Sequence, residues 1–248
     1  MLRPRTLRAL AAARHAGLHV VIVTGRMFRS VRPYLEQAGL TDPVVCYQGA
    51  VVADPVSGDF LRHVPIPIEP ALEAIAAVEE EGFALNCYVD DLLYVARETS
   101  GSRAYADFQG LEIHAVGDLR SWLVREPTKL VAVGEPHALD GLEVRMKQRF
   151  DDRLYISKSL PYFLEFAHPS VTKGAGLDFL AARLGVKPER TIAFGDGEND
   201  VELVDWAGFG IAVANAHDRV LAAADWVCPR VDDEGVAQVL EALLDSRQ

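Results

Sequence analysis

Three side chains with oxygen donors lie close together in residues 191–204, whose sequence is TIAFGDGENDVELV. The first four letters predict a buried parallel strand, which runs into the turn GDG and then a helix. Asp196 therefore lies where open α/β sheets bind ligands, and Asn199 and Asp200 follow about one turn later. Carboxylate and amide oxygens are the ligands that hard divalent cations prefer, which favours a metal site. The alternative is that these residues only cap the helix and suit its positive end.

Lys173 lies at the start of a second predicted helix, residues 172–184, where the helix macrodipole disfavours a positive charge. A solvated surface lysine would tolerate this position. The other interpretation is that Lys173 and the first amide groups of the helix together bind an anion.

A third polar group follows another apolar run, residues 19–23, which predicts a buried parallel strand. Thr24 and Gly25 come next and offer a hydroxyl and a backbone N–H, although Thr24 alone is equally typical of a helix cap. If these segments share one sheet, Thr24, Lys173 and Asp196 converge in one crevice as donor, cation and metal ligand. That combination suits phosphoryl transfer, in which catalysis is mostly positioning and charge neutralisation.

Composition limits the partners that the chain can have. The 248 residues are 50% hydrophobic and carry a net charge of −11, which argues against nucleic acid or an anionic membrane surface as a partner. Cys46, Cys87 and Cys228 show neither metal nor redox spacing and are expected to be buried thiols. No signal peptide or membrane-spanning run is recognisable, so we expect a soluble, cytoplasmic protein. The oligomeric state cannot be predicted.

The order of predicted elements indicates two domains. A helix at 4–16 precedes the strand at 19–23, a helix that ends near Gly39 and a strand at 43–47, and βα alternation resumes after Ser170. Between them, helices and hairpins indicate an inserted α+β module. We therefore predict an α/β fold, with a Rossmann-like core of residues 1–66 and 169–248 and a cap of residues 67–168.

With these residues in hand, the chain resembles the haloacid dehalogenase superfamily, in particular its Cof-type (class IIB) phosphatases. The sequence VVIVTGR at 20–26 is similar to the second motif of the family, SVTKG at 170–174 to the third, and GDGEND at 195–200 to the fourth. GIAVANA at 210–216 and DEGV at 233–236 match its closing pattern. The resemblance covers nearly the whole chain and implies a core with a mobile cap that hydrolyses phosphomonoesters with Mg²⁺.

The resemblance also implies roles for individual residues. Thr24, with Gly25, would hydrogen-bond the phosphoryl group, and Lys173 would offset its charge. Arg26 would contact the phosphate or make a structural ion pair. Asp196 would bind Mg²⁺ directly. The two residues that would hold the waters of the metal and orient Lys173 are Asn199 and Asp200, and Asn199 also borders the phosphate.

Two departures from the family stand out. The first motif, D-x-D-G-T, which supplies the attacking aspartate and the general acid–base, is absent, and no Asp precedes Asp42. We therefore expect that the sequence starts about twenty residues late, the length of a strand and its turn, and that the chain alone is inactive. Gln48 is a smaller departure, because the family usually has Asn there.

The function that follows is a Mg²⁺-dependent phosphatase for a small phosphorylated metabolite, with a sugar phosphate as the expected class. The alternative is a non-catalytic relative that binds phosphate or metal and regulates or scaffolds. A dinucleotide-dependent oxidoreductase is disfavoured, since no strand is followed by G-x-G-x-x-G.

Overall fold

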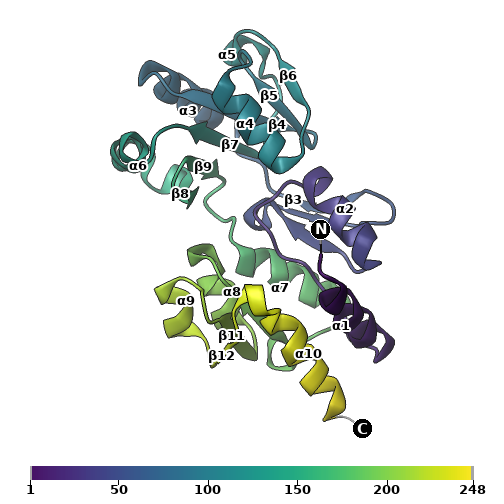
Figure 1. The fold of residues 1–248 in the computed structure, drawn as a ribbon. Helices are drawn as coiled ribbons and strands as arrows, with labels where there is room; N and C mark the ends of the chain where they lie inside the picture. The colour runs from purple at the N-terminus through teal and green to yellow at the C-terminus, as the bar shows by residue number, and fades with distance from the viewer. Residues whose placement is uncertain (1, 247–248) are drawn as a thin grey trace. The chain divides into compact units, whose positions relative to one another are not determined.

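The computed structural model of the protein describes residues 2–246. The chain divides into two compact units (Figure 1). Unit 1 comprises Met1–Thr24, Val31–Leu61 and Thr172–Gln248, and unit 2 comprises Gly25–Ser30 and Arg62–Val171. The chain therefore passes between the units four times.

A three-stranded parallel sheet forms one part of unit 1. Its strands are β10 (Ile192–Gly195), β11 (Phe209–Val213) and β12 (Trp226–Cys228), in the order β10-β11-β12. Short apolar runs bounded by glycine and polar residues produce these strands, as parallel strands covered by helices require. Strand β10 lies at one edge of the sheet, and the chain continues from its carboxyl end into the turn of Asp196 and Gly197.

A second sheet in unit 1 has the order β1-β2-β3, with β1 (Val44–Cys46) antiparallel to β2 (Val51–Ala53) and β3 (Phe60–His63) outermost. The predicted strand at 19–23 is reduced to a parallel bridge between Val23 and Val45. Thr24 donates its backbone N–H to the Val45 carbonyl at 2.8 Å. In the described residues, the segment ending at Thr24 and strand β10 thus belong to different sheets rather than to one.

Helices flank both sheets of unit 1. They are α1 (Pro4–His15), α2 (Phe28–Ala38, whose first three residues are assigned to unit 2), α7 (Lys173–Leu184), α8 (Val201–Trp206), α9 (Asp218–Ala223) and α10 (Gly235–Asp245). Helices α1 and α10 lie side by side (Figure 1), and the Arg5 guanidinium pairs with the Glu241 carboxylate at 2.5 Å.

Unit 2 is built on a six-stranded sheet of order β6-β5-β4-β7-β9-β8. The strands are β4 (Ala84–Val89), β5 (Leu92–Val95), β6 (Ile113–Ala115), β7 (Lys129–Val133), β8 (Tyr155–Leu160) and β9 (Phe163–Ala167). The helices are α3 (Ile68–Glu80), α4 (Ser100–Gln109), α5 (Leu119–Trp122) and α6 (Pro136–Phe150).

The two faces of this sheet differ in chemistry, because alternate residues of a strand point to opposite faces. One face packs against α3, α5 and α6 and forms an apolar core that includes Cys87, Leu130 and Phe166. The residues that alternate with these carry polar groups, among them Tyr88 and Lys129, and Tyr88 meets helix α4 through the hydroxyl of Tyr105. Unit 2 thus has one apolar core and one polar layer.

The cap predicted at residues 67–168 lies entirely within unit 2, whose main segment is Arg62–Val171. The structure also assigns Gly25–Ser30 to unit 2, whereas the sequence analysis placed these residues in the core. Among the α-helices and strands, α4, β6 and α9 were not predicted from the sequence. No helix of the described residues is both long and apolar enough to cross a membrane.

Candidate functional site

The turn after β10 is organised around the carboxylate of Asp200. Its Oδ2 accepts the backbone N–H groups of Asp196 and Gly197, each at 3.0 Å. Gly195 allows this close approach, because a Cβ at that position would lie 2.8 Å from Cβ of Asp200. The backbone carbonyl of Asp196 is held from the other side by the N–H of His217 at 2.8 Å. The turn therefore holds the backbone of Asp196 in a fixed position.

Lys173 and Asp200 form a buried ion pair. The ammonium lies 2.5 Å from Asp200 Oδ1, and the two side chains are 8% and 7% exposed. Lys173 is the first residue of α7, whose N-cap Thr172 accepts a hydrogen bond from the N–H of Ala175. Asp200 thus contacts the ammonium that it was predicted to orient, and the orienting role itself stays a prediction.

The pKa values of Asp196 and Asp200 are shifted in opposite directions. Burial opposes ionisation of Asp200, but the Lys173 ammonium and the backbone N–H bonds outweigh it, so the pKa of Asp200 is lowered. Desolvation raises the pKa of Asp196, and the negative charge of Asp200 raises it further. A cation placed at Asp196 would relieve this charge repulsion.

Gln48 links the other parts of the site and was not among the predicted site residues. Its Oε1 accepts a hydrogen bond from Asn199 Nδ2 at 2.9 Å, and its backbone N–H donates to the Thr24 carbonyl at 3.1 Å. Through Gln48, the segment ending at Thr24 is connected to the turn that carries Asn199. The one feature of the sequence that could have identified Gln48 as a site residue is its position beside Gly49, just after a strand.

The turn that presents Gln48 has an unusual backbone. Tyr47, Gln48 and Gly49 have φ values of 52°, 59° and 104°, and two of these are non-glycine residues in the left-handed region, which costs free energy. Gly49 packs against the start of α7 so closely that a Cβ would lie 1.9 Å from the Thr172 carbonyl oxygen. This contact places the start of α7, and with it Lys173, beside the turn of residues 47–49.

Two predicted phosphate-binding residues, Gly25 and Arg26, belong to unit 2 and make contacts there. The Gly25 carbonyl accepts a hydrogen bond from Lys129 Nζ at 3.1 Å. The Arg26 guanidinium donates to Ser30 Oγ at 3.3 Å and lies 5.6 Å from the ring centroid of Phe108. The described contacts bring together Lys173, Asp196, Asn199 and Asp200, with Thr24 connected through Gln48.

Few oxygen donors near the turn are available for the predicted metal ion. The described residues contain no group of three or more His, Cys, Asp or Glu side chains suited to a metal ion. Both oxygens of Asp200 already accept hydrogen bonds, which leaves the Asp196 carboxylate and the Asn199 amide oxygen. A carboxylate and an amide oxygen fit a hard cation such as Mg²⁺, which keeps several waters when it binds proteins.

A buried polar cluster in unit 2 was not predicted from the sequence. Lys129 Nζ lies 3.2 Å from Glu165 Oε1 and 5.3 Å from the ring centroid of Tyr88, whose hydroxyl is hydrogen-bonded to that of Tyr105. Burial raises the pKa of Tyr105. Burial alone would lower the pKa of Lys129, but Glu165 and Tyr105 outweigh it and the pKa is raised. On the same face, Asn86 Nδ2 is buried without a hydrogen-bond partner in the described residues.

Comparison with known proteins gives consistent matches over nearly the whole length of the chain. A sequence profile for the haloacid dehalogenase-like hydrolase family matches residues 1–240. A phosphoglycolate phosphatase from Archaeoglobus fulgidus is 30% identical over 241 residues, which cover 97% of this chain and 90% of that protein.

Solved structures share the fold. A crystal structure from Thermotoga maritima has a TM-score of 0.87 at 30% identity and covers 97% of this chain and 90% of its own. A sugar phosphatase of haloacid dehalogenase subclass IIB has a TM-score of 0.82 at 22% identity, with coverage of 98% and 92%. The α/β fold with a parallel-sheet core and a cap is thereby confirmed.

Proposed function

Because the chain belongs to the haloacid dehalogenase-like hydrolase family, we propose that it is a Mg²⁺-dependent phosphatase for a small phosphorylated metabolite. A sugar phosphate is the first substrate class to test. The observation that carries this proposal is the buried Lys173–Asp200 pair at the start of α7, beside the exposed carboxylate of Asp196.

Lys173 supports an anion site because only part of its hydrogen-bonding capacity is used by Asp200. An ammonium has three donors, and one of them points to Asp200 Oδ1. The first amide groups of α7 and the positive end of its macrodipole favour a negative group at the same place. Lys173 would hold the transferring phosphoryl group and offset its charge, and Thr24 would donate a hydrogen bond to it.

Asp196 and Asn199 are the residues that would hold Mg²⁺. The ion, when bound, neutralises charge on the phosphoryl oxygens. Asp196 contributes the charged ligand, while Asn199, fixed by Gln48, contributes or positions a neutral oxygen. Asp200 would act indirectly by holding both the turn and Lys173 in place.

The attacking group is the part of the machinery that this chain does not supply. The 248 residues contain no D-x-D-G-T, and a phosphate positioned by Thr24 and Lys173 has nothing to attack it. Strand β10 is at the edge of the described sheet β10-β11-β12, and the segment ending at Thr24 pairs with β1 through Val45. We therefore propose that the chain as printed binds ligand but does not turn it over.

A thermal-unfolding titration with MgCl₂ and inorganic phosphate tests the binding site. A ligand at a hundred times its dissociation constant stabilises by about 2.7 kcal/mol, roughly 5–10 °C for a protein of this size. Asp196→Asn is expected to abolish the Mg²⁺-dependent part of the shift, and Lys173→Met the phosphate-dependent part. Glu198→Gln, in the same turn, is the matched control. An unchanged Mg²⁺ response in Asp196→Asn would remove this residue from the metal site.

Turnover needs a separate assay. With p-nitrophenyl phosphate, the printed chain is expected to be inactive, and the same chain preceded by a D-x-D-G-T strand is expected to be active in a Mg²⁺-dependent manner. Robust turnover by the printed chain would mean that another nucleophile exists.

The missing nucleophile also favours a second candidate, a non-catalytic relative that binds phosphate or metal for regulation. Ligand binding without turnover in the extended protein would support it over the phosphatase. Screening the extended protein against phosphorylated metabolites would then identify either the substrate or the ligand.

A further inference from the structure

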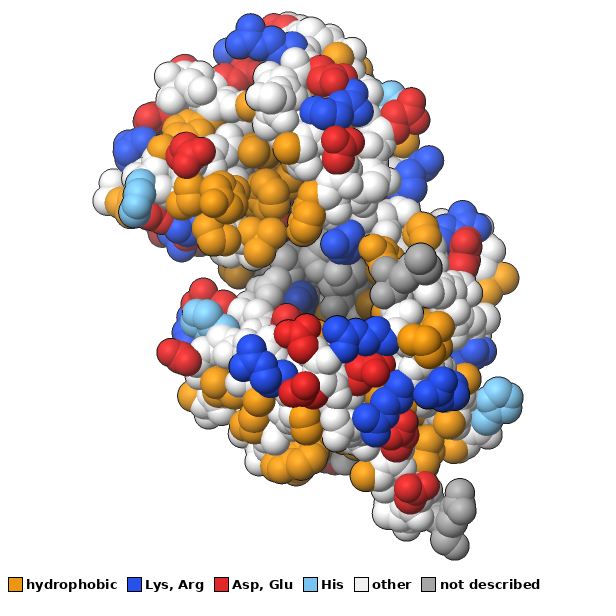
Figure 2. Space-filling view, in the orientation of Figure 1, with side chains coloured by type: hydrophobic (Ala, Val, Ile, Leu, Met, Phe, Trp, Pro, Cys, Tyr) orange, Lys and Arg blue, Asp and Glu red, His pale blue; other side chains and the backbone are white. Residues whose placement is uncertain are grey.

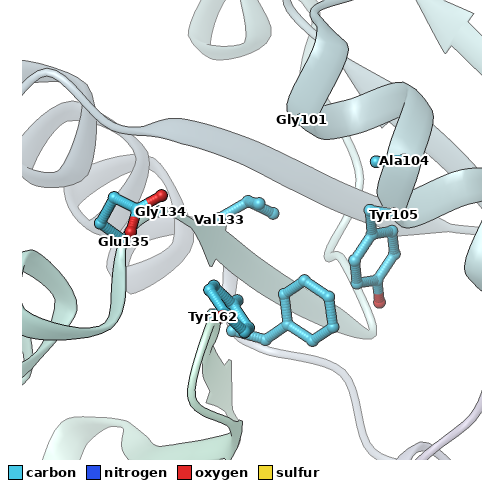
Figure 3. A pocket seen from close by; sticks show the side chains of 8 residues that line it. Gly101, Ala104, Tyr105, Val133, Gly134, Glu135 and Tyr162 are labelled. Atoms are coloured by element: carbon cyan, nitrogen blue, oxygen red, sulfur yellow. The ribbon is translucent and has the colours of Figure 1, made fainter.

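A pocket of about 450 Å³ lies wholly within unit 2, between helix α4 and the ends of β7 and β9. Figure 3 shows the side chains that line it; they are Gly101, Ala104, Tyr105, Val133, Gly134, Glu135, Tyr162 and Phe163. Its volume falls in the range typical of small-molecule sites, roughly 300–1,000 Å³. None of these residues belongs to the candidate site of unit 1.

Aromatic rings form the main wall of the pocket. Tyr105 and Phe163 meet edge to face, with ring centroids 4.7 Å apart, and Tyr162 stands beside them with 52% of its surface exposed. Figure 2 shows hydrophobic side chains gathered on the surface of unit 2, and the exposed large hydrophobic residues of this unit include Phe108 and Tyr162. Aromatic walls favour a flat ligand that can stack or meet a ring edge.

The inner wall is held rigidly. The Tyr105 hydroxyl is hydrogen-bonded to that of Tyr88, behind which lies the buried Lys129–Glu165 pair. Tyr105 therefore cannot turn without breaking a buried hydrogen bond, which is costly. A preorganised wall lowers the entropy cost of binding.

One charged group borders this apolar space. The Glu135 carboxylate lies at the rim, next to Val133 and Gly134 (Figure 3). Glu135 is the N-cap residue of the 15-residue helix α6, but its side chain makes no capping hydrogen bond, and no other partner for its carboxylate occurs among the described residues. The positive end of α6 stabilises the negative charge there. The pocket thus offers aromatic faces and an unpaired anion.

The neighbouring aromatic surface already holds a planar cation. The Arg26 guanidinium lies 5.6 Å from the centroid of Phe108, and Phe108 lies 6.4 Å from Phe163. Flat cations bind ring faces through the quadrupole of the ring, and the attraction grows when water is excluded. The same chemistry is available inside the pocket, with Glu135 as counter-charge.

We propose that this pocket binds a planar nitrogen heterocycle, whose ring stacks against Tyr162 and Phe163, which the buried Tyr105 supports from behind, while a protonated ring or amino N–H pairs with Glu135. Neither an anionic ring nor a non-planar amine meets both requirements. The residues that line the pocket all belong to unit 2, and none of them is shared with the candidate site of unit 1.

Isothermal titration calorimetry of the full chain with three probes tests the ligand class. The 4-aminopyridinium ion is planar and cationic, benzoate is planar and anionic, and cyclohexylammonium is cationic but not planar. We expect saturable binding of 4-aminopyridinium and at least tenfold weaker binding of the other two. Equal affinity for all three, or no binding of 4-aminopyridinium, overturns the proposal.

Four variants locate the binding, and two of them are controls. Glu135→Gln, at an exposed position, is expected to weaken 4-aminopyridinium binding at least tenfold. Ala104→Leu places a larger side chain in the pocket from the exposed surface of α4 and is expected to abolish binding, whereas Ala12→Leu on exposed α1 is the matched control. Asp196→Asn is expected to leave 4-aminopyridinium binding unchanged. The two proposals can therefore be refuted separately. Unaltered affinity in Glu135→Gln overturns the assigned counter-charge.

Discussion

Replacing Asp200 by Asn is expected to destabilise unit 1 by about 3–5 kcal/mol, the usual result of removing one partner from a buried ion pair. Asp200 Oδ1 lies 2.5 Å from Lys173 Nζ, and Oδ2 accepts two backbone N–H groups at 3.0 Å. An amide has one acceptor oxygen, so its NH₂ would face either the Lys173 ammonium or both backbone donors. The Lys173 ammonium, whose side chain is 8% exposed, would also lose its ion-pair partner.

The measurement is urea unfolding followed by tryptophan fluorescence. Of the three tryptophans, Trp206 and Trp226 lie in unit 1 and Trp122 in unit 2. A Trp122→Phe background therefore makes the signal report unit 1 alone. The free energy of unfolding comes from the midpoint and slope of the transition.

Glu198→Gln is the matched control, because Glu198 lies in the same turn and its carboxylate pairs with Arg219 at 2.7 Å, with side chains 55% and 67% exposed. Such exposed pairs contribute about 0–1 kcal/mol. The double variant Lys173→Met/Asp200→Asn should cost less than the sum of its single changes, since no unpaired charge remains. An Asp200→Asn effect no larger than that of Glu198→Gln would refute the reasoning.

Two further predictions concern packing and protonation. Gly49→Ala should destabilise unit 1 by at least about 1–3 kcal/mol, the cost of one strained backbone position, because its Cβ would lie 1.9 Å from the Thr172 carbonyl oxygen. Urea unfolding measures this loss. Gly17→Ala is the control, since Gly17 also has a positive φ but has open space around its Cβ position. Burial raises the pKa of Cys87 from 9.0 to about 12, so iodoacetamide at pH 10 should modify it only in unfolded protein, as peptide mass spectrometry would show. The contribution of the neutral thiol to the free energy of unfolding is fully present below pH 9. Up to about 4 kcal/mol of that free energy is lost as the pH rises from 9 to 12. Fast labelling of native Cys87 would contradict this.

Local sequence patterns were sufficient for most elements. Apolar periodicity and glycine or proline boundaries predicted the strands and helices that have strong patterns, such as β10 and α7. Helix α4 was missed because its sequence, SGSRAYADFQ, begins with Ser and Gly and carries few apolar residues. β6 has only three residues and α9 only six, too few for a period to emerge.

The strand at 19–23 shows the limit of local reasoning. Its sequence, HVVIV, has high strand propensity, but a strand exists only where a neighbour pairs with it. In the described residues β1 alone pairs with this segment, through Val45, so one bridge results. Sheet membership depends on partners distant in sequence and cannot be read from the five residues.

The same distinction applies to the candidate site. Residue types and strand ends indicated Lys173, Asp196 and Asp200, since charged groups at these positions need an explanation. The contribution of Gln48 depends on three consecutive residues with positive φ, two of which are not glycine, and no sequence rule favours that. The burial of Lys129 was equally hidden, because its partner Glu165 lies 36 positions away.

The assignment of Gly25–Ser30 to unit 2 has a consequence for domain exchange among relatives. Asp91 binds the backbone N–H groups of Phe28 and Arg29, and Ser30 Oγ donates to the Gln109 carbonyl. A chimaera that exchanges residues 62–171 alone would lose these hydrogen bonds. The Asp91 carboxylate would then lack the two backbone donors that it has here. Specificity grafts, and recombination in nature, would have to carry six residues from elsewhere in the gene, which makes the cap a poor candidate for modular inheritance.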